Sequence, residues 1–96
     1  MNIKPTNIFL AGDSAGGNLA LSLTGLILKH KETIPKGIYA SYPATDMRMI
    51  FSESRLHSIT DVLLWPSTLL LCLNQYLKGD WSKAEDPLAS PALLTE

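Results

Sequence analysis

A serine flanked by glycines lies near the start of the chain, and its type and spacing suit covalent chemistry. The segment Gly12–Gly16 reads G-D-S-A-G, a G-x-S-x-G pattern with Ser14 at its centre. The apolar run Ile8–Ala11 before it predicts a buried strand, and the segment after it predicts a helix. Strand, sharp turn and helix form the context in which this pattern makes a nucleophile elbow. The spacing therefore predicts acyl transfer from an ester-type substrate, with Ser14 as the nucleophile.

The residues beside Ser14 each have an expected part in that turn. The sharp bend places Ser14 in a strained backbone conformation that costs about 1–3 kcal/mol. We expect glycine at 12 and 16 because strand and helix pass too close there for a Cβ atom. The backbone N–H of Ala15, at the helix start, is expected to donate to an oxyanion. Asp13 is better suited to orient neighbouring groups than to transfer protons.

The alternative interpretation is a glycine-rich turn that binds phosphate or carries no chemistry. Phosphate sites of this kind use a G-x-G-x-x-G spacing or a lysine directly after the glycines. The chain has neither feature around Gly12–Gly17. The elbow interpretation is therefore favoured.

A strand, a helix and a second strand are expected to position this turn. The helix is predicted from Ala15 to about Lys31, with apolar residues at helical spacing. Pro35 indicates a loop after this helix, and the second strand is predicted over Gly37–Pro43. Two strands joined by a helical crossover pair in parallel, each covered by helices on its faces.

The second half of the chain predicts one further helix with two alternative starts. Ser58–Asp61 resembles a capping box, and Pro66 suits a first helical turn. The helix is predicted to run to Lys78 and to stop at Gly79. Met47–Ser54 and Asp80–Glu96 are predicted to be irregular.

Composition excludes several classes of protein. With 8 basic and 9 acidic residues mixed along the chain, the net charge is −1, which argues against an electrostatic site for nucleic acid. The apolar run Val62–Leu73 is shorter than the roughly 20 residues of a membrane span, so we expect a buried or interface-facing helix. Cys72 is the only cysteine, and its leucine neighbours favour a buried structural thiol. A lone cysteine fits a reducing, intracellular compartment.

Beyond the elbow, the sequence resembles a known family. Residues Gly12–Ala20, G-D-S-A-G-G-N-L-A, resemble the elbow of the hormone-sensitive lipase family of α/β-hydrolases. The resemblance continues at Tyr42-Pro43 and over Asp86–Leu94, and covers about residues 8–94. One segment resembles the lipase branch of this family in particular: Ser52–Leu56, Ser58, Asp61 and Leu63-Leu64.

This resemblance implies an α/β fold with a parallel strand–elbow–helix–strand unit and a helical cap or loop segment. It implies hydrolysis of carboxylic esters, acylglycerols included, with no cofactor and no metal. Ser14 and the Ala15 N–H carry over as catalytic groups, with the surrounding turn in support: Gly12, Asp13, Gly16 and Gly17. The implied location is intracellular, either in the cytoplasm or at the surface of a lipid droplet that the protein contacts.

The resemblance also implies that parts of the site lie outside this chain. The family has a glycine-rich oxyanion motif upstream of the elbow, and its catalytic aspartate and histidine follow downstream. Only 13 residues precede Ser14 here. We therefore expect residues 1–96 to be the central part of one α/β-hydrolase domain.

Other polar and aromatic residues of the chain are further candidates for the site. His30 lies about 24 Å along the helix from Ser14, beyond hydrogen-bond reach. His57 with Asp46 has the right chain order for a triad but falls in the cap segment. Asp46 either lines the substrate site or forms a turn, and Trp65 is the apolar residue best placed to meet substrate. Arg55 could pair with Asp61 or bind a substrate carbonyl, but a surface or structural role is favoured.

Two other functions stay open. Plant hormone receptors of the same family keep the elbow and lose the histidine, so this segment would look similar in a binding protein. The chain would instead be an inactive remnant if nothing flanks it, because two strands leave open sheet edges and a short chain buries little surface.

Overall fold

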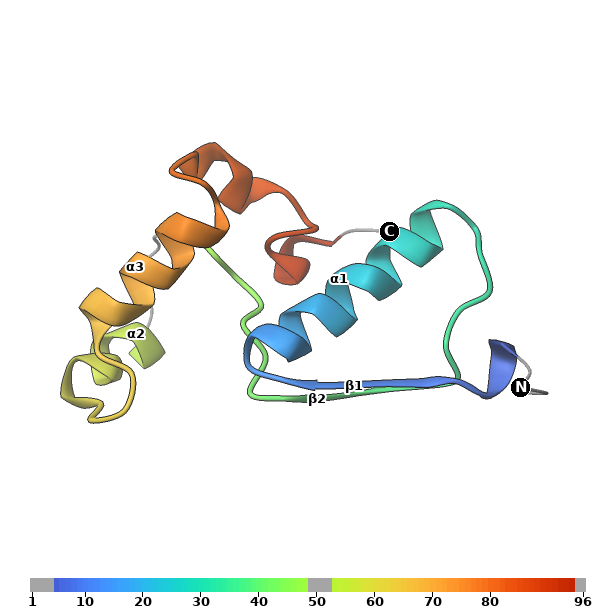
Figure 1. The fold of residues 1–96 in the computed structure, drawn as a ribbon, viewed down its shortest axis with the longest axis horizontal. Helices are drawn as coiled ribbons and strands as arrows, with labels where there is room; N and C mark the ends of the chain where they lie inside the picture. Colours follow the sequence, from blue (N-terminus) through green and yellow to red (C-terminus); the bar gives the residue numbers. More distant parts are fainter. Residues whose placement is uncertain (1–4, 49–52, 95–96) are drawn as a thin grey trace.

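The computed structural model describes residues 5–48 and 53–94. Its order of elements matches a strand, helix and strand followed by a helical segment (Figure 1). The helices and strands are β1 (Phe9–Asp13), α1 (Ala15–Lys29), β2 (Gly37–Ser41), α2 (Glu53–His57) and α3 (Pro66–Tyr76). Short 3₁₀ turns precede β1, follow α2 and follow α3. The segment expected to be irregular, Met47–Ser54, lies partly outside the described residues, and Ser52 lies wholly outside them. At its described end the expectation is wrong, because α2 begins at Glu53.

The two strands form a parallel pair in the register Phe9↔Gly37 through Asp13↔Ser41. This confirms the predicted crossover, although β1 begins and ends one to two residues later than expected. α1 lies along one face of the sheet (Figure 1). The expectation of cover on both faces is wrong for the described residues, because no second helix packs on the sheet and Phe9 is 64% exposed.

Small side chains form the inward face of α1. Gly17, Ala20 and Gly25 are buried, together with the polar side chain of Asn18. Of the larger apolar residues of the helix, Leu19, Leu23 and Leu28 are exposed and the others are partly buried. The helix therefore packs closely because its contact face has little side-chain volume.

Both long helices end in the same way. Beyond α1, Lys31 adopts φ 54° and its N–H donates to Leu28, while the N–H of Glu32 donates to the carbonyl of Ile27. Beyond α3, Lys78 adopts φ 53° in the equivalent position. These are Schellman endings in which lysine occupies the left-handed position that glycine usually takes. α3 thus ends two residues earlier than predicted.

In the second half of the chain, α3 begins at Pro66, which confirms one of the two predicted starts. The start at Ser58 is wrong, because residues Ser58–Thr60 form a 3₁₀ turn. The carboxylate of Asp61 accepts hydrogen bonds from the N–H groups of Leu63 and Leu64, at 2.8 and 3.1 Å. Asp61 therefore stabilises a turn before the helix instead of the first turn of a longer one.

A small hydrophobic core joins α3 to the end of the chain. Its buried members are Met47, Leu73, Leu77, Ala84 and Ala89. Asp80–Glu96 was expected to be irregular, and its described part contains two 3₁₀ turns, Trp81–Glu85 and Pro91–Leu93. Within residues 5–48 and 53–94, no helix combines the length and apolar character needed to cross a membrane.

Candidate active site

Ser14 lies at the junction of β1 and α1 in a strained conformation with positive φ, at φ 50° and ψ −115°. This confirms the predicted strain at the turn. The Ser14 N–H donates to the carbonyl of Ser41 at the end of β2, at 3.0 Å. Its carbonyl accepts from the N–H groups of Asn18 and Ala44, at 3.1 and 3.2 Å. The backbone N–H of the serine is therefore held by β2, and its carbonyl is held by α1 and by the segment after β2.

The glycines around Ser14 have different surroundings. A Cβ at Gly12 would collide with the backbone carbonyl of Gly16, as expected where strand and helix cross. A Cβ at Gly16 would meet only Asp13 Oδ1, at 3.8 Å, which is ordinary contact. The steric explanation for Gly16 is therefore wrong for the described residues. It applies to Gly17 instead, where a Cβ would lie 2.8 Å from Pro43 Cβ.

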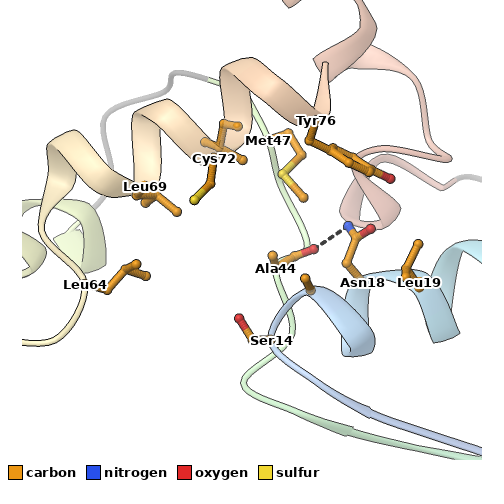
Figure 2. Close-up of a pocket in the computed structure, with 11 residues that line it drawn as sticks. Ser14, Asn18, Leu19, Ala44, Met47, Leu64, Leu69, Cys72 and Tyr76 are labelled. Carbon is orange, nitrogen blue, oxygen red and sulfur yellow. Dashed lines mark hydrogen bonds between the residues drawn. The ribbon is translucent and has the colours of Figure 1, made fainter. Parts of the chain in front are cut away.

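A cavity of about 370 Å³ opens beside Ser14, between the start of α1 and the face of α3 (Figure 2). Its lining is mostly apolar. Ser14 and Ala15 form one side, and Leu69 and Tyr76 of α3 lie across from them. The serine hydroxyl therefore faces a space suited to an apolar chain.

Cys72 also lines this cavity. The expectation of a buried structural thiol is wrong, because Cys72 is exposed. On α3, Leu73 and Leu77 are one turn apart and face the core, where both are buried. Cys72 lies beside that stripe, so its side chain falls on the cavity wall.

Asp46 forms a tight turn with Arg48. One carboxylate oxygen accepts from the Arg48 N–H at 2.9 Å, and the other accepts from the guanidinium Nη2 at 2.7 Å. The hydrogen bond from the Arg48 side chain lowers the pKa of Asp46 below its ordinary value of 3.8. Arg55 Nη2 donates to the backbone carbonyl of Asp46 at 2.8 Å, which supports the structural interpretation of this arginine.

The two residues suggested as substrate-lining lie near the cavity without lining it. Asp46 is in the turn just described, and the exposed Trp65 donates from Nε1 to the carbonyl of Val62 at 3.2 Å. Their neighbours Met47 and Leu64 line the cavity instead. A substrate contact by either residue stays a prediction.

The histidines of the chain are both away from the cavity lining. His30 caps the C-terminal end of α1, and His57 is the last residue of α2. Asp13 accepts a hydrogen bond from the hydroxyl of Tyr42 at 3.3 Å, in line with an orienting role. Among residues 5–48 and 53–94, no three His, Cys, Asp or Glu side chains are grouped to hold a metal ion.

Asn18 is a residue whose importance the sequence did not reveal. Asn18 is 2% exposed, and its Nδ2 donates to the carbonyl of Ala44 at 2.6 Å (Figure 2). The same Nδ2 also donates to the carbonyl of Ala89 at 2.8 Å. The sequence did contain a signal for a buried Asn18, because this polar residue stands among small and apolar residues of the predicted helix. The acceptors were not predictable, since Ala89 is 71 positions away.

A parallel strand–helix–strand unit with a strained serine between its first strand and helix defines an α/β protein of the hydrolase type. The chain belongs to the alpha/beta hydrolase fold family, whose model matches residues 1–95.

Known relatives of the chain are lipases and esterases. It is 42% identical over 79 residues to hormone-sensitive lipase of Mus musculus, a match that covers 82% of this chain and 10% of the lipase. It is 34% identical over 89 residues to an esterase of Acinetobacter venetianus, covering 93% of this chain and 29% of the esterase. The crystal structure of carboxyl esterase 2 from Tuber melanosporum superposes with a TM-score of 0.87 at 29% identity, over 97% of this chain and 30% of the esterase.

Proposed function

We propose that the protein carrying this chain hydrolyses carboxylic esters of the acylglycerol type, with Ser14 as its nucleophile. The observation that supports this most is Ser14 with positive φ at a strand–helix turn, beside an apolar cavity of about 370 Å³. The chain spans 10% of the length of the mouse lipase and 30% of the Tuber esterase. Activity of the whole protein is therefore part of the proposal.

In the proposed reaction, Ser14 Oγ attacks the ester carbonyl carbon while a histidine base takes its proton. The resemblance assigns this histidine and its aspartate to parts of the protein outside residues 1–96. The carbonyl oxygen becomes an oxyanion and accepts a hydrogen bond from the Ala15 N–H at the start of α1. The histidine then protonates the leaving alkoxide, and water hydrolyses the acyl-serine by the same steps. The proposed reaction uses no cofactor and no metal.

The apolar cavity supports an acyl chain as the group held beside Ser14. Leu69 and Leu73 of α3 line it together with Met47, and apolar walls of this kind stabilise a methylene chain by about 0.8 kcal/mol per buried CH₂. Ser14 and Ala15 lie on the opposite side of the cavity. A substrate with its acyl chain in the cavity can therefore present its carbonyl to the serine.

We further propose that the protein is intracellular and contacts lipid surfaces through the loop before α3. Val62 and Leu63 of this loop are 84% and 94% exposed, and the loop adjoins Leu64 on the cavity wall. Apolar side chains that project from a loop favour transfer to a lipid interface. Flotation with lipid vesicles tests this: Leu63→Ser is expected to reduce the bound fraction, and equal flotation of the variant would contradict the contact.

The nucleophile is tested by active-site labelling of the full-length protein. A fluorophosphonate is expected to add one equivalent to wild-type protein and none to Ser14→Ala, which should also lose hydrolysis of p-nitrophenyl butyrate. Ser67→Ala, an exposed serine on α3, is the matched control and should behave as wild type. Folded protein that binds esters without labelling or turnover would favour the receptor alternative.

A further inference from the structure

The backbone of Ala44 is held beside Ser14 at both its N–H and its carbonyl. Its N–H donates to the carbonyl of Ser14 at 3.2 Å. Its own carbonyl accepts from Asn18 Nδ2 at 2.6 Å. The backbone N–H of Asn18 donates to that same Ser14 carbonyl, at 3.1 Å. Ser14, Ala44 and Asn18 therefore form a closed ring of hydrogen bonds, which we name the Ala44 ring.

The Asn18 carboxamide is committed to this arrangement by burial. Its side chain is 2% exposed, and its second Nδ2 hydrogen donates to the carbonyl of Ala89 at 2.8 Å. A buried donor that loses its acceptor costs about 1–3 kcal/mol, so the amide has a strong preference for these two carbonyls. Only an amide or similar group donates two hydrogen bonds at this place, since a carboxylate would only accept.

The Ala44 ring also sets the wall of the cavity. Ala44 and Met47 both line it. The N–H of Met47 donates to Ser90 Oγ at 2.7 Å, and this fully buried hydroxyl donates in turn to the carbonyl of Ala84 at 2.6 Å. The segment after β2 is thus fixed by Asn18 at one end and by Ser90 at the other.

We infer that Asn18 is a positioning residue for Ser14, acting through the backbone of Ala44. This inference rests on the proposed ester hydrolysis. The carboxamide fixes Ala44, and Ala44 fixes the carbonyl of the strained serine and the cavity wall that faces it. Catalysis depends on sub-ångström placement of the nucleophile, and a misplacement of about 1 Å costs on the order of 100-fold in rate.

A neighbouring residue provides a matched control. Ser22 lies one helical turn beyond Asn18 on α1, and its Oγ donates to the carbonyl of Leu88. Ser22→Ala therefore removes a side-chain hydrogen bond between α1 and the same C-terminal segment, without touching the Ala44 ring. Asn18→Asp keeps the shape of the side chain and removes both of its donors. Asn18→Ala also removes both donors but adds no charge, and alanine is a good helix former.

The experiment compares these variants in the full-length protein, well below their unfolding temperatures. With p-nitrophenyl butyrate, Asn18→Asp and Asn18→Ala are expected to lower kcat about 10- to 100-fold with KM within about twofold. Ser22→Ala is expected to keep wild-type kcat. Hydrogen exchange at the Ala44 amide is expected to quicken in both Asn18 variants and to stay unchanged in Ser22→Ala.

Amide exchange keeps this test separate from that of the proposed function. Wild-type protein without labelling at Ser14 overturns ester hydrolysis, whatever the variants do. If wild type is active but the Asn18 variants keep kcat, or lose it no more than Ser22→Ala does, the positioning role is wrong. Unchanged exchange at the Ala44 amide in a folded Asn18 variant overturns it as well.

Discussion

At the elbow, two adjacent glycines are predicted to respond oppositely to the same substitution. In Gly17→Ala the new methyl would lie 2.8 Å from Pro43 Cβ, which forces α1 away from the end of β2. Overpacking of this kind costs about 1–3 kcal/mol. In Gly16→Ala the methyl has room, and alanine is favoured over glycine in a helix by up to about 1 kcal/mol. Urea unfolding of both variants measures the difference.

The outcome separates steric from conformational causes. A loss of stability in Gly17→Ala with none in Gly16→Ala is the expected pattern. Equal losses in both variants would show that Gly16 has a contact that the described residues do not contain.

The turn at Asp46 gives a prediction in pH. The hydrogen bond from Arg48 lowers the pKa of Asp46 in the folded state, so the unfolded chain binds the proton more readily. The stabilisation is therefore complete above the ordinary pKa of 3.8 and is lost as pH falls below it, through the folded value. Because the pair is near the surface, we expect about 1 kcal/mol or less.

Comparison of wild type with Asp46→Asn tests this sign. The difference in their free energies of unfolding, measured in urea at several pH values, is expected to be largest near neutral pH and to shrink below pH 3.8. Arg48→Gln should produce the same trend. A difference that grows toward low pH would mean that the folded state raises this pKa.

At the scale of elements, the helix ends carry a further prediction. Lys31 has φ 54° in the Schellman ending of α1, a conformation that costs an L-residue about 1–2 kcal/mol relative to glycine. Lys31→Gly is therefore expected to raise the unfolding free energy by about 1 kcal/mol. Lys29→Gly, within the last turn of the same helix, is expected to lower it by about as much.

Thermal or urea unfolding of this pair compares the same residue change at two positions. Opposite signs would confirm that the left-handed position limits stability. A loss in both variants would show that the Lys31 side chain makes a compensating contribution at the helix end.

Local features of the elements were readable from the sequence. The apolar strand, the glycines around Ser14 and the proline at the start of α3 each determine backbone conformation within a few residues. The wrong helix start at Ser58 shows the limit of such prediction. In a capping box the Asp61 carboxylate would accept a hydrogen bond from the N–H of Ser58. In the structure it accepts from Leu63 and Leu64 instead, and sequence spacing does not decide between these alternatives.

Long-range contacts were not readable in this way. The hydrogen bond from Asn18 to Ala89 joins residues 71 positions apart, and that between Met47 and Ser90 joins residues 43 apart. Such partners are chosen by how the segments pack. The strained turn at Ser14 depends on neighbouring residues and was predicted correctly. The position of Cys72 on the wall of the cavity depends on how α3 packs, and it was not predicted.

At the scale of the whole molecule, the chain is extended for its length. It measures 47 × 27 × 23 Å, and its radius of gyration is 15.1 Å. A compact domain of this size has a radius of gyration of about 12.5 Å. Figure 1 shows the cause: the sheet with α1 forms one part and the α2–α3 segment forms another. The cavity beside Ser14 lies between them, so its shape depends on how the two parts pack.

This arrangement predicts weak cooperativity for residues 1–96 on their own. The buried core is small, and large side chains such as Phe9, Leu63 and Trp65 remain exposed. At roughly 25 cal/mol per Å² of apolar surface buried, so small a core does little to offset the conformational entropy of the chain.

We expect strong binding of the dye ANS and a broad thermal transition, measured by circular dichroism. The same residues within the full-length protein should bind little dye, because additional chain can cover these side chains. A sharp calorimetric transition with little dye binding would show that the two parts hold each other, and the cavity, without further cover.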